Sequence, residues 1–119
     1  MRLLIVDDNA HFLEAARGLL EREGITVVAV ASTSADALRR IQEFQPDVTL
    51  VDIDLGNDSG FELAQQLATA TSGARSRVIL ISATPEQDLV DLIDESPAIG
   101  FVSKSDLSAL AITRLLARE

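Results

Sequence analysis

Three acidic residues in this sequence stand directly after runs of apolar or β-branched residues. Asp7 and Asp8 follow the run 3–6, and Asp52 follows the run 48–51. Such runs are typical of buried strands, so each acid is expected at the carboxyl end of a strand. An ionised carboxylate in that position is costly unless it is paired, solvated or bound to a metal ion. We therefore ask which groups compensate these charges, above all that of Asp52.

Two further polar side chains are predicted at the same edge of the sheet. Ser82 ends the apolar run 78–81, and Lys104 lies in the loop after the run 99–102. In an open parallel sheet, ligands bind beyond the carboxyl ends of the strands. If the first and third strands are neighbours, three carboxylates converge on one pocket at this edge, where the hydroxyl and the ammonium also lie.

These residue types favour phosphoryl chemistry at a metal site. Clustered carboxylates raise one another's pKa values unless a cation lies among them. An all-oxygen set with no nearby His or Cys suits a hard ion such as Mg²⁺, which binds carboxylates together with waters and phosphate oxygens. Attack by an aspartate would then form an aspartyl-phosphate. The ion, a hydroxyl and an ammonium would spread the charge of the transferring phosphoryl group. Each residue alone has a structural explanation, so the prediction depends on their joint appearance.

Strands alternate with helices along the whole chain, and a helix is expected after each strand. The predicted strands are 3–6, 26–31, 48–52, 78–82 and 99–102. This alternation predicts right-handed βαβ units and a parallel sheet with helices on both faces. The strands are continuous apolar runs, as expected for strands that are covered on both faces. The predicted fold class is an α/β sandwich.

Capping residues predict where several helices begin and end. Asn9 is the predicted N-cap of the first helix, which carries Phe12 as a core residue, and Gly24 is expected to end this helix in a left-handed conformation. The segment 84–87 combines a hydroxyl cap with Pro at the first helical position and Gln at the third, which is typical of a helix start. Ser105 is predicted to cap the last helix.

Length, charge and composition limit the classes of protein to which the chain can belong. Its 119 residues predict one domain, 1–119, with a sizeable core. The absence of cysteine excludes disulfides and thiolate chemistry and fits a reducing cytoplasm. The net charge of −9 argues against direct contact with nucleic acid. Acids follow after only four apolar residues, so we expect neither a signal peptide nor a membrane span.

Five motifs in register carry a resemblance to a known family. They are Val6-Asp7-Asp8, Asp52 with Gly60 eight residues later, Ser82-Ala83, Phe101 nineteen residues beyond Ser82, and Lys104 twenty-two residues beyond Ser82. Over essentially its whole length, the chain resembles the receiver domain of bacterial two-component response regulators, the CheY-like family. The resemblance implies a doubly wound (βα)5 sandwich of the flavodoxin/CheY-like kind, whose five-stranded parallel sheet has the order 2-1-3-4-5.

The resemblance also implies roles for the residues of the site. Asp52 would accept a phosphoryl group from a phosphohistidine on a sensor histidine kinase or a phosphotransfer protein. Asp7, Asp8 and Asp52 would hold Mg²⁺ together with the backbone carbonyl of Asp54, and Mn²⁺ would be able to substitute. Lys104 would pair with the phosphoryl oxygens. The domain would thus catalyse its own phosphorylation and a slow dephosphorylation, without being a conventional enzyme.

A conformational switch is the second implication of the resemblance. Ser82 would donate a hydrogen bond once Asp52 is modified, and Phe101 would move from an exposed to a buried position. The changed surface would comprise the fourth helix, the fifth strand and the fifth helix. This surface would act on a downstream protein target or on the chain's own effector domain, and it would allow a phosphorylation-dependent homodimer. A plain core position is the alternative explanation of Phe101.

Two departures from the family pattern lead to specific expectations. Ser105 replaces the proline that often follows the lysine with a cis peptide. Because a cis bond without proline costs roughly 3 kcal/mol, we predict a trans bond between Lys104 and Ser105. Gly56 replaces a proline that is common after the phosphorylated strand, and a glycine is expected to loosen that loop.

Two other functions remain open from the sequence. The first is a pseudo-receiver, a protein-interaction module that works without phosphorylation; the presence of every site residue argues against it. The second is a stand-alone hydrolase, because Asp52-Ile53-Asp54 has the Asp-x-Asp form of aspartyl-phosphate phosphatases. In that family the motif follows an early strand, and the pair Asp7-Asp8 would be left unexplained.

Overall fold

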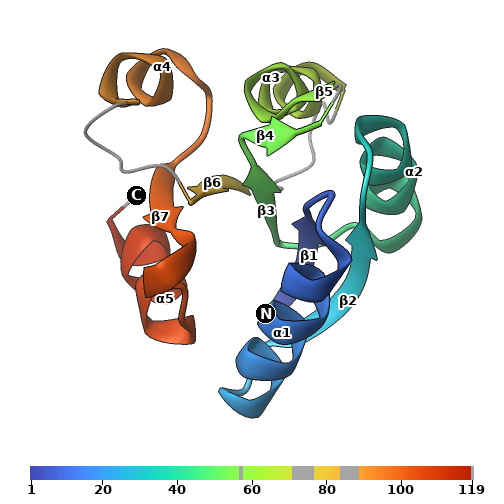
Figure 1. Cartoon of the computed structure of the whole chain (residues 1–119), viewed down its shortest axis with the longest axis vertical. Helices are drawn as coiled ribbons and strands as arrows, with labels where there is room; N and C mark the ends of the chain where they lie inside the picture. Colours follow the sequence, from blue (N-terminus) through green and yellow to red (C-terminus); the bar gives the residue numbers. More distant parts are fainter. Residues whose placement is uncertain (57, 71–76, 84–88, 119) are drawn as a thin grey trace.

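The computed structural model describes residues 1–56, 58–70, 77–83 and 89–118 of the chain (Figure 1). A central sheet of five strands has the order β2-β1-β3-β6-β7, and all of its neighbouring strands are parallel. The strands are β1 (Arg2–Val6), β2 (Thr26–Ala31), β3 (Val48–Asp52), β6 (Arg77–Ser82) and β7 (Gly100–Ser103). Because β6 and β7 are the fourth and fifth strands of this sheet, the predicted order 2-1-3-4-5 is confirmed.

Helices cover both faces of the sheet. They are α1 (Ala10–Arg22), α2 (Ser34–Phe44), α3 (Gly60–Ala70), α4 (Val90–Glu95) and α5 (Ala109–Ala117). Figure 1 shows α1 and α5 on one side of the sheet and α2, α3 and α4 on the other. This arrangement confirms the predicted α/β sandwich. Among the described residues, no helix has both the length and the apolar character needed to span a membrane.

The sheet separates two hydrophobic cores, and β1 contributes to both. Leu3 and Ile5 pack in the core that contains residues of α1 and α5, whereas Leu4 and Val6 pack in the core that contains residues of α2 and α3. All four side chains have no exposed surface. Alternate residues of a strand point to opposite faces, and full burial of one such aliphatic side chain contributes about 1.5–3 kcal/mol. The continuous apolar runs of the sequence follow from this double burial.

Helix ends agree with the predictions at α1 and differ at α5. Asn9 caps α1 and accepts a hydrogen bond from the Phe12 amide, and Gly24 has the expected positive φ of 95°. The predicted cap of the last helix, Ser105, is wrong. Ser108 caps α5 instead, with its hydroxyl accepting from the Ala111 amide at 3.0 Å. The predicted helix start at 84–87 lies outside the described residues.

Two short elements near the end of the sheet were not predicted. The two-residue strands β4 (Asp54–Leu55) and β5 (Asp58–Ser59) pair in antiparallel fashion between β3 and α3. A 3₁₀ turn, η2 (Lys104–Asp106), connects β7 to the segment before α5. This turn contains Ser105, where the last helix was expected to start, and its first residue is Lys104.

Candidate functional site

Three carboxylates converge at the carboxyl ends of β1 and β3. The two strands are direct neighbours with Val6 opposite Val51. Asp7, the residue after β1, and Asp52, the last residue of β3, therefore lie at the same level. One carboxylate oxygen from each of Asp7, Asp8 and Asp52 lies within 4.8 Å of the others. Asp7 has no exposed surface and Asp52 is 4% exposed, whereas Asp8 is exposed. The structure thus brings together the three acids that the sequence places at strand ends.

Lys104, which follows the edge strand β7, supplies a positive charge to this cluster. Its Nζ lies 2.7 Å from Asp7 Oδ2 and 3.1 Å from Asp52 Oδ2, and the second contact is a hydrogen bond. Lys104 follows β7, which is separated from β3 by β6. Its side chain therefore reaches across the end of β6 to contact residues of β3 and β1. The peptide bond to Ser105 is trans, as predicted.

Burial and charge shift the pKa values of Asp52 and Lys104. Burial raises the pKa of Asp52 to about 6, and the negative charge of Asp7 acts in the same direction. The Asp54 amide and Lys104 oppose this rise without cancelling it. Burial alone would lower the pKa of Lys104, but its interactions with Asp7 and Asp52 outweigh that effect and raise the pKa. The ammonium is therefore held in its charged form beside the carboxylate of Asp52.

Local backbone hydrogen bonds orient the two buried carboxylates. Asp7 Oδ1 accepts from the Asn9 amide at 2.9 Å, and Asp52 Oδ1 accepts from the Asp54 amide at 3.1 Å. Each carboxylate thus uses one oxygen for the following turn and directs the other toward Lys104. Gly60 allows the chain to return close to this turn, because a Cβ at that position would lie 2.1 Å from the Asp52 carbonyl oxygen.

The β4–β5 hairpin forms the wall of the site beside Asp8. Gly56 has φ of 72°, and a Cβ there would lie 3.2 Å from Asp8 Oδ2. The Gly56 amide donates to Asp54 Oδ1 at 3.3 Å. On the outer side, Asp58 Oδ2 accepts from the Ser34 amide at 3.1 Å, which ties the hairpin to the start of α2. Glycine at position 56 is therefore favoured both by the positive φ and by the short distance to the Asp8 carboxylate.

The donor set of the cluster fits a divalent hard cation. All three candidate ligands are carboxylate oxygens, which are the donors that Mg²⁺ and Mn²⁺ prefer. Three carboxylates beside one ammonium leave two negative charges, which one divalent ion would balance. Asp7 and Asp52 are buried and Asp8 is exposed. An ion would therefore enter the cluster from solvent on the side of Asp8.

A family model for the response regulator receiver domain matches residues 3–113. The chain belongs to this family. It is 30% identical over 103 residues to the chemotaxis protein CheY of Bacillus subtilis, a match that covers 87% of this chain and 84% of CheY. It is 34% identical over 116 residues to protein-glutamate methylesterase/protein-glutamine glutaminase 5 of Myxococcus xanthus, which covers 97% of this chain but 32% of that protein. In the first three curated relatives, the matched part is 32% to 50% of their length.

Solved receiver structures have the same architecture. The signal receiver domain of the NarL response regulator from Mycobacterium tuberculosis superimposes with a TM-score of 0.83 at 28% identity, covering 98% of this chain and 97% of that one. A LuxR-family response regulator from Aurantimonas sp. SI85-9A1 gives a TM-score of 0.83 at 27% identity, covering 98% and 83%. The CheY-like fold expected from the sequence is thereby confirmed.

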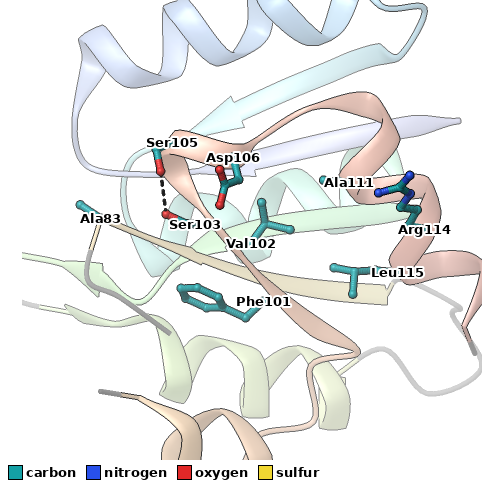
Figure 2. A pocket seen from close by; sticks show the side chains of 9 residues that line it. All are labelled: Ala83, Phe101, Val102, Ser103, Ser105, Asp106, Ala111, Arg114 and Leu115. Atoms are coloured by element: carbon teal, nitrogen blue, oxygen red, sulfur yellow. Dashed lines mark hydrogen bonds between the residues drawn. The ribbon is translucent and has the colours of Figure 1, made fainter. Parts of the chain in front are cut away.

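In this receiver domain, Ser82 and Phe101 lie on the two strands beyond β3. Asp52 pairs with Ile81, so the buried Ser82 ends β6 one residue further along. Phe101 is half-buried on the edge strand β7, where it packs against the core of α2 and α3. It lines a pocket of about 600 Å³. Figure 2 shows its ring directed toward the end of the sheet where Ala83 lies, away from Leu115.

Sequence reasoning missed two parts of the receiver site. The first is the β4–β5 hairpin beside Asp8, because strands of two residues leave no periodic pattern in the sequence. The second is Phe12, which was predicted only as a core residue. Its ring centroid lies 4.4 Å from Lys104 Nζ. Its position one helical turn beyond Asp8 was the one available signal, because the N-cap Asn9 places that turn beside the carboxylates.

Proposed function

We propose that this receiver domain takes part in a phosphorelay by accepting a phosphoryl group from a histidine kinase or phosphotransfer protein on Asp52, in a Mg²⁺-dependent reaction. Membership of the family supports phosphorelay signalling as its general role. The observation that carries the specific proposal is the arrangement of Asp52. Its Oδ2 lies beside the Lys104 ammonium. Carboxylate oxygens of Asp7, Asp8 and Asp52 lie within 4.8 Å of one another, close enough to bind one metal ion together.

The chemistry requires a nucleophile, a leaving group and compensation of charge. An Asp52 oxygen attacks phosphorus while the bond from phosphorus to the imidazole nitrogen breaks, and the electron pair of that bond returns to the imidazole. Lys104 Nζ already contacts Asp52 Oδ2. Its ammonium is therefore placed to pair with the phosphoryl oxygens once the negative charge has moved to them. Asp7, Asp8, Asp52 and the Asp54 carbonyl would hold Mg²⁺, which supplies charge stabilisation to the phosphoryl oxygens when bound.

The consequence of phosphorylation is proposed to be a switch through Ser82 and Phe101. A phosphoryl group adds negative charge and strong acceptors, and it can shift a conformation only through contacts that differ between two states. Ser82 is proposed to donate to it, which draws the end of β6 toward Asp52 and lets Phe101 turn from its half-buried position to a buried one beside Ala83. The half-buried position of Phe101, in a pocket that it lines together with Ala83, supports this step.

The output surface is proposed to comprise α4, β7 and α5. Large apolar side chains are exposed on both of its helices: Leu92 on α4 is 50% exposed and Leu110 on α5 is 58% exposed. Such side chains suit a protein partner better than solvent. The proposed partners are a downstream target, an effector domain of the same protein, or a second phosphorylated copy of this domain.

The test is phosphorylation by a small donor that contains a P–N bond, such as phosphoramidate. The protein, incubated with Mg²⁺, is expected to gain the mass of one phosphoryl group, and Asp52→Asn is expected to gain none. Asp94→Asn, which alters an exposed acid on α4, serves as the matched control and should label like wild type. Intact-mass spectrometry is the suitable readout because the chain has no tryptophan or tyrosine for fluorescence.

Three outcomes would contradict the proposal, and two of them would indicate another function. Equal labelling of wild type and Asp52→Asn would remove Asp52 as the acceptor. No labelling, together with partner binding that Asp52→Asn leaves unchanged, would indicate a phosphorylation-independent interaction module. Steady turnover of phosphomonoesters would indicate a hydrolase, whereas the proposal predicts only slow loss of the phosphoryl group from Asp52.

A further inference from the structure

The ammonium of Lys104 has a third neighbour besides its two carboxylates. Its Nζ lies 4.4 Å from the centroid of the Phe12 ring, while Asp7 Oδ2 and Asp52 Oδ2 lie at 2.7 and 3.1 Å. A cation within about 6 Å of an aromatic centroid is attracted by the ring's quadrupole. The attraction is stronger where water is excluded, and the Lys104 side chain is only 19% exposed.

The position of Phe12 is fixed by the first turn of α1. The N-cap Asn9 accepts from the Phe12 amide at 3.2 Å, and Asn9 in turn donates its own amide to Asp7 Oδ1. The ring is half-buried and packs against the core of α1 and α5. The aromatic face and the carboxylate of Asp7 are therefore parts of one rigid segment that surrounds the ammonium from the α1 side.

We propose that Phe12 is a positioning residue for Lys104, whose aromatic face holds the ammonium at the site while its carboxylate partner changes. This inference rests on the proposed function for the step in which Asp52 becomes an aspartyl-phosphate. In that step one Asp52 oxygen becomes part of the bond to phosphorus, and the contact at 3.1 Å must be exchanged for one to a phosphoryl oxygen. The ring is neutral and takes no part in the reaction, so its attraction to the ammonium persists throughout the exchange.

Three variants separate the aromatic face from simple packing. Phe12→Leu keeps an apolar side chain but removes the face, and Phe12→Tyr restores the face. Phe44→Leu is the matched control, because Phe44 is also a half-buried phenylalanine on a helix but packs in the opposite core. A purely structural role predicts similar effects for the two leucine variants, whereas a positioning role predicts an effect of Phe12→Leu alone that Phe12→Tyr reverses.

The first measurement needs no phosphorylation. Lys104 is the sole lysine of the chain, so protein labelled with ε-¹³C-lysine gives a single ε-methylene signal in an NMR spectrum. Because the ammonium lies over the ring, we expect an upfield ring-current shift of this signal in wild type and Phe12→Tyr. The shift should be lost in Phe12→Leu and kept in Phe44→Leu. An unshifted wild-type signal would overturn the contact.

The second measurement is the rate of Mg²⁺-dependent labelling by phosphoramidate. Loss of a partly desolvated cation–π contact predicts labelling about threefold to tenfold slower in Phe12→Leu, with recovery in Phe12→Tyr. Equal rates in wild type and Phe12→Leu, or equal slowing in Phe12→Leu and Phe44→Leu, would overturn the positioning role. If wild type itself takes no label, the proposed function fails, whereas a ring shift lost only in Phe12→Leu still supports the contact.

Discussion

Asp52 combines burial at the end of β3 with a nearby cation, and the two act on its charge in opposite directions. Its pKa is raised to about 6, with burial as the main cause, although Lys104 Nζ lies only 3.1 Å away. The carboxylate is thus ionised at pH 7 and available as a nucleophile, but its charge is not fully compensated by the protein alone. A divalent cation would supply the missing compensation.

The raised pKa of Asp52 predicts a pH-dependent effect of Asp52→Asn on stability. The contribution of protonated Asp52 is fully present below the unfolded pKa of 3.8 and is lost as pH rises through about 6. Without divalent ions, Asp52→Asn should therefore be more stable than wild type at pH 7.5, by about 1–3 kcal/mol. This difference in the free energy of unfolding should disappear as pH falls toward 4. Urea unfolding of both proteins across this range measures it, and a gap independent of pH would contradict the prediction.

Gly56 is predicted to influence metal binding through Asp8. Gly56→Ala and Gly24→Ala both place a side chain at positive φ, with φ of 72° and 95°, so each should lose about 1–2 kcal/mol of stability. A Cβ at Gly56 lies 3.2 Å from Asp8 Oδ2, whereas nothing lies within 4 Å of one at Gly24. Calorimetric titration with Mg²⁺ should therefore show weaker binding only for Gly56→Ala. Equal affinities in the two variants would exclude an effect through Asp8.

The residues of the site differ in how far the sequence alone reveals them. Asp7, Asp52 and Lys104 were predictable because an apolar run delivers each of them to one edge of a parallel sheet. Contacts between side chains of the site were harder to predict from the sequence. Phe12 has the type and spacing of a core residue on an amphipathic helix, and its contact with Lys104 depends on how α1 lies against η2, which no local pattern encodes.

At the scale of elements, the start of α5 gives a direct test of capping. Ser108 caps this helix, whereas the hydroxyl of Ser105 lies 3.0 Å from that of Ser103 in an exposed turn (Figure 2). Ser108→Ala should cost about 1 kcal/mol of stability, the usual value for loss of an N-cap. Ser105→Ala should cost a few tenths at most. Thermal unfolding of both variants measures the difference, and equal costs would contradict the observed helix start.

Regular elements were predictable because burial imposes a pattern on them, and their exact ends were less so. The strands β1, β2, β3, β6 and β7 were all located from apolar runs, since each is covered on both faces. The start of α5 was misplaced because several serines precede it, and any of them offers the same hydroxyl. The β4–β5 hairpin has strands of two residues each, too short for a period of two to be recognised.

For the whole molecule, the acidic cluster predicts that divalent ions stabilise the fold. An ion that binds only the folded state raises the free energy of unfolding by about 2.7 kcal/mol at a concentration one hundred times its dissociation constant. Mg²⁺ and Mn²⁺ should therefore raise the melting temperature, and removal of the ion by a chelator should reverse the effect. Asp8→Asn should abolish most of the increase. An identical increase in wild type and Asp8→Asn would indicate binding elsewhere on this acidic protein.

The reach of Lys104 across the end of β6 has a consequence for biosynthesis and folding. The two ends of its hydrogen bond to Asp52 are 52 residues apart in the chain, so the contact can form only when a long loop has closed. Ribosomes complete β1 and β3 well before they complete η2. A nascent chain can thus contain every acid of the site and still lack its ammonium. The phosphoryl transfer that we propose would therefore need the edge strand β7 to be docked, and local unfolding of that edge would abolish it.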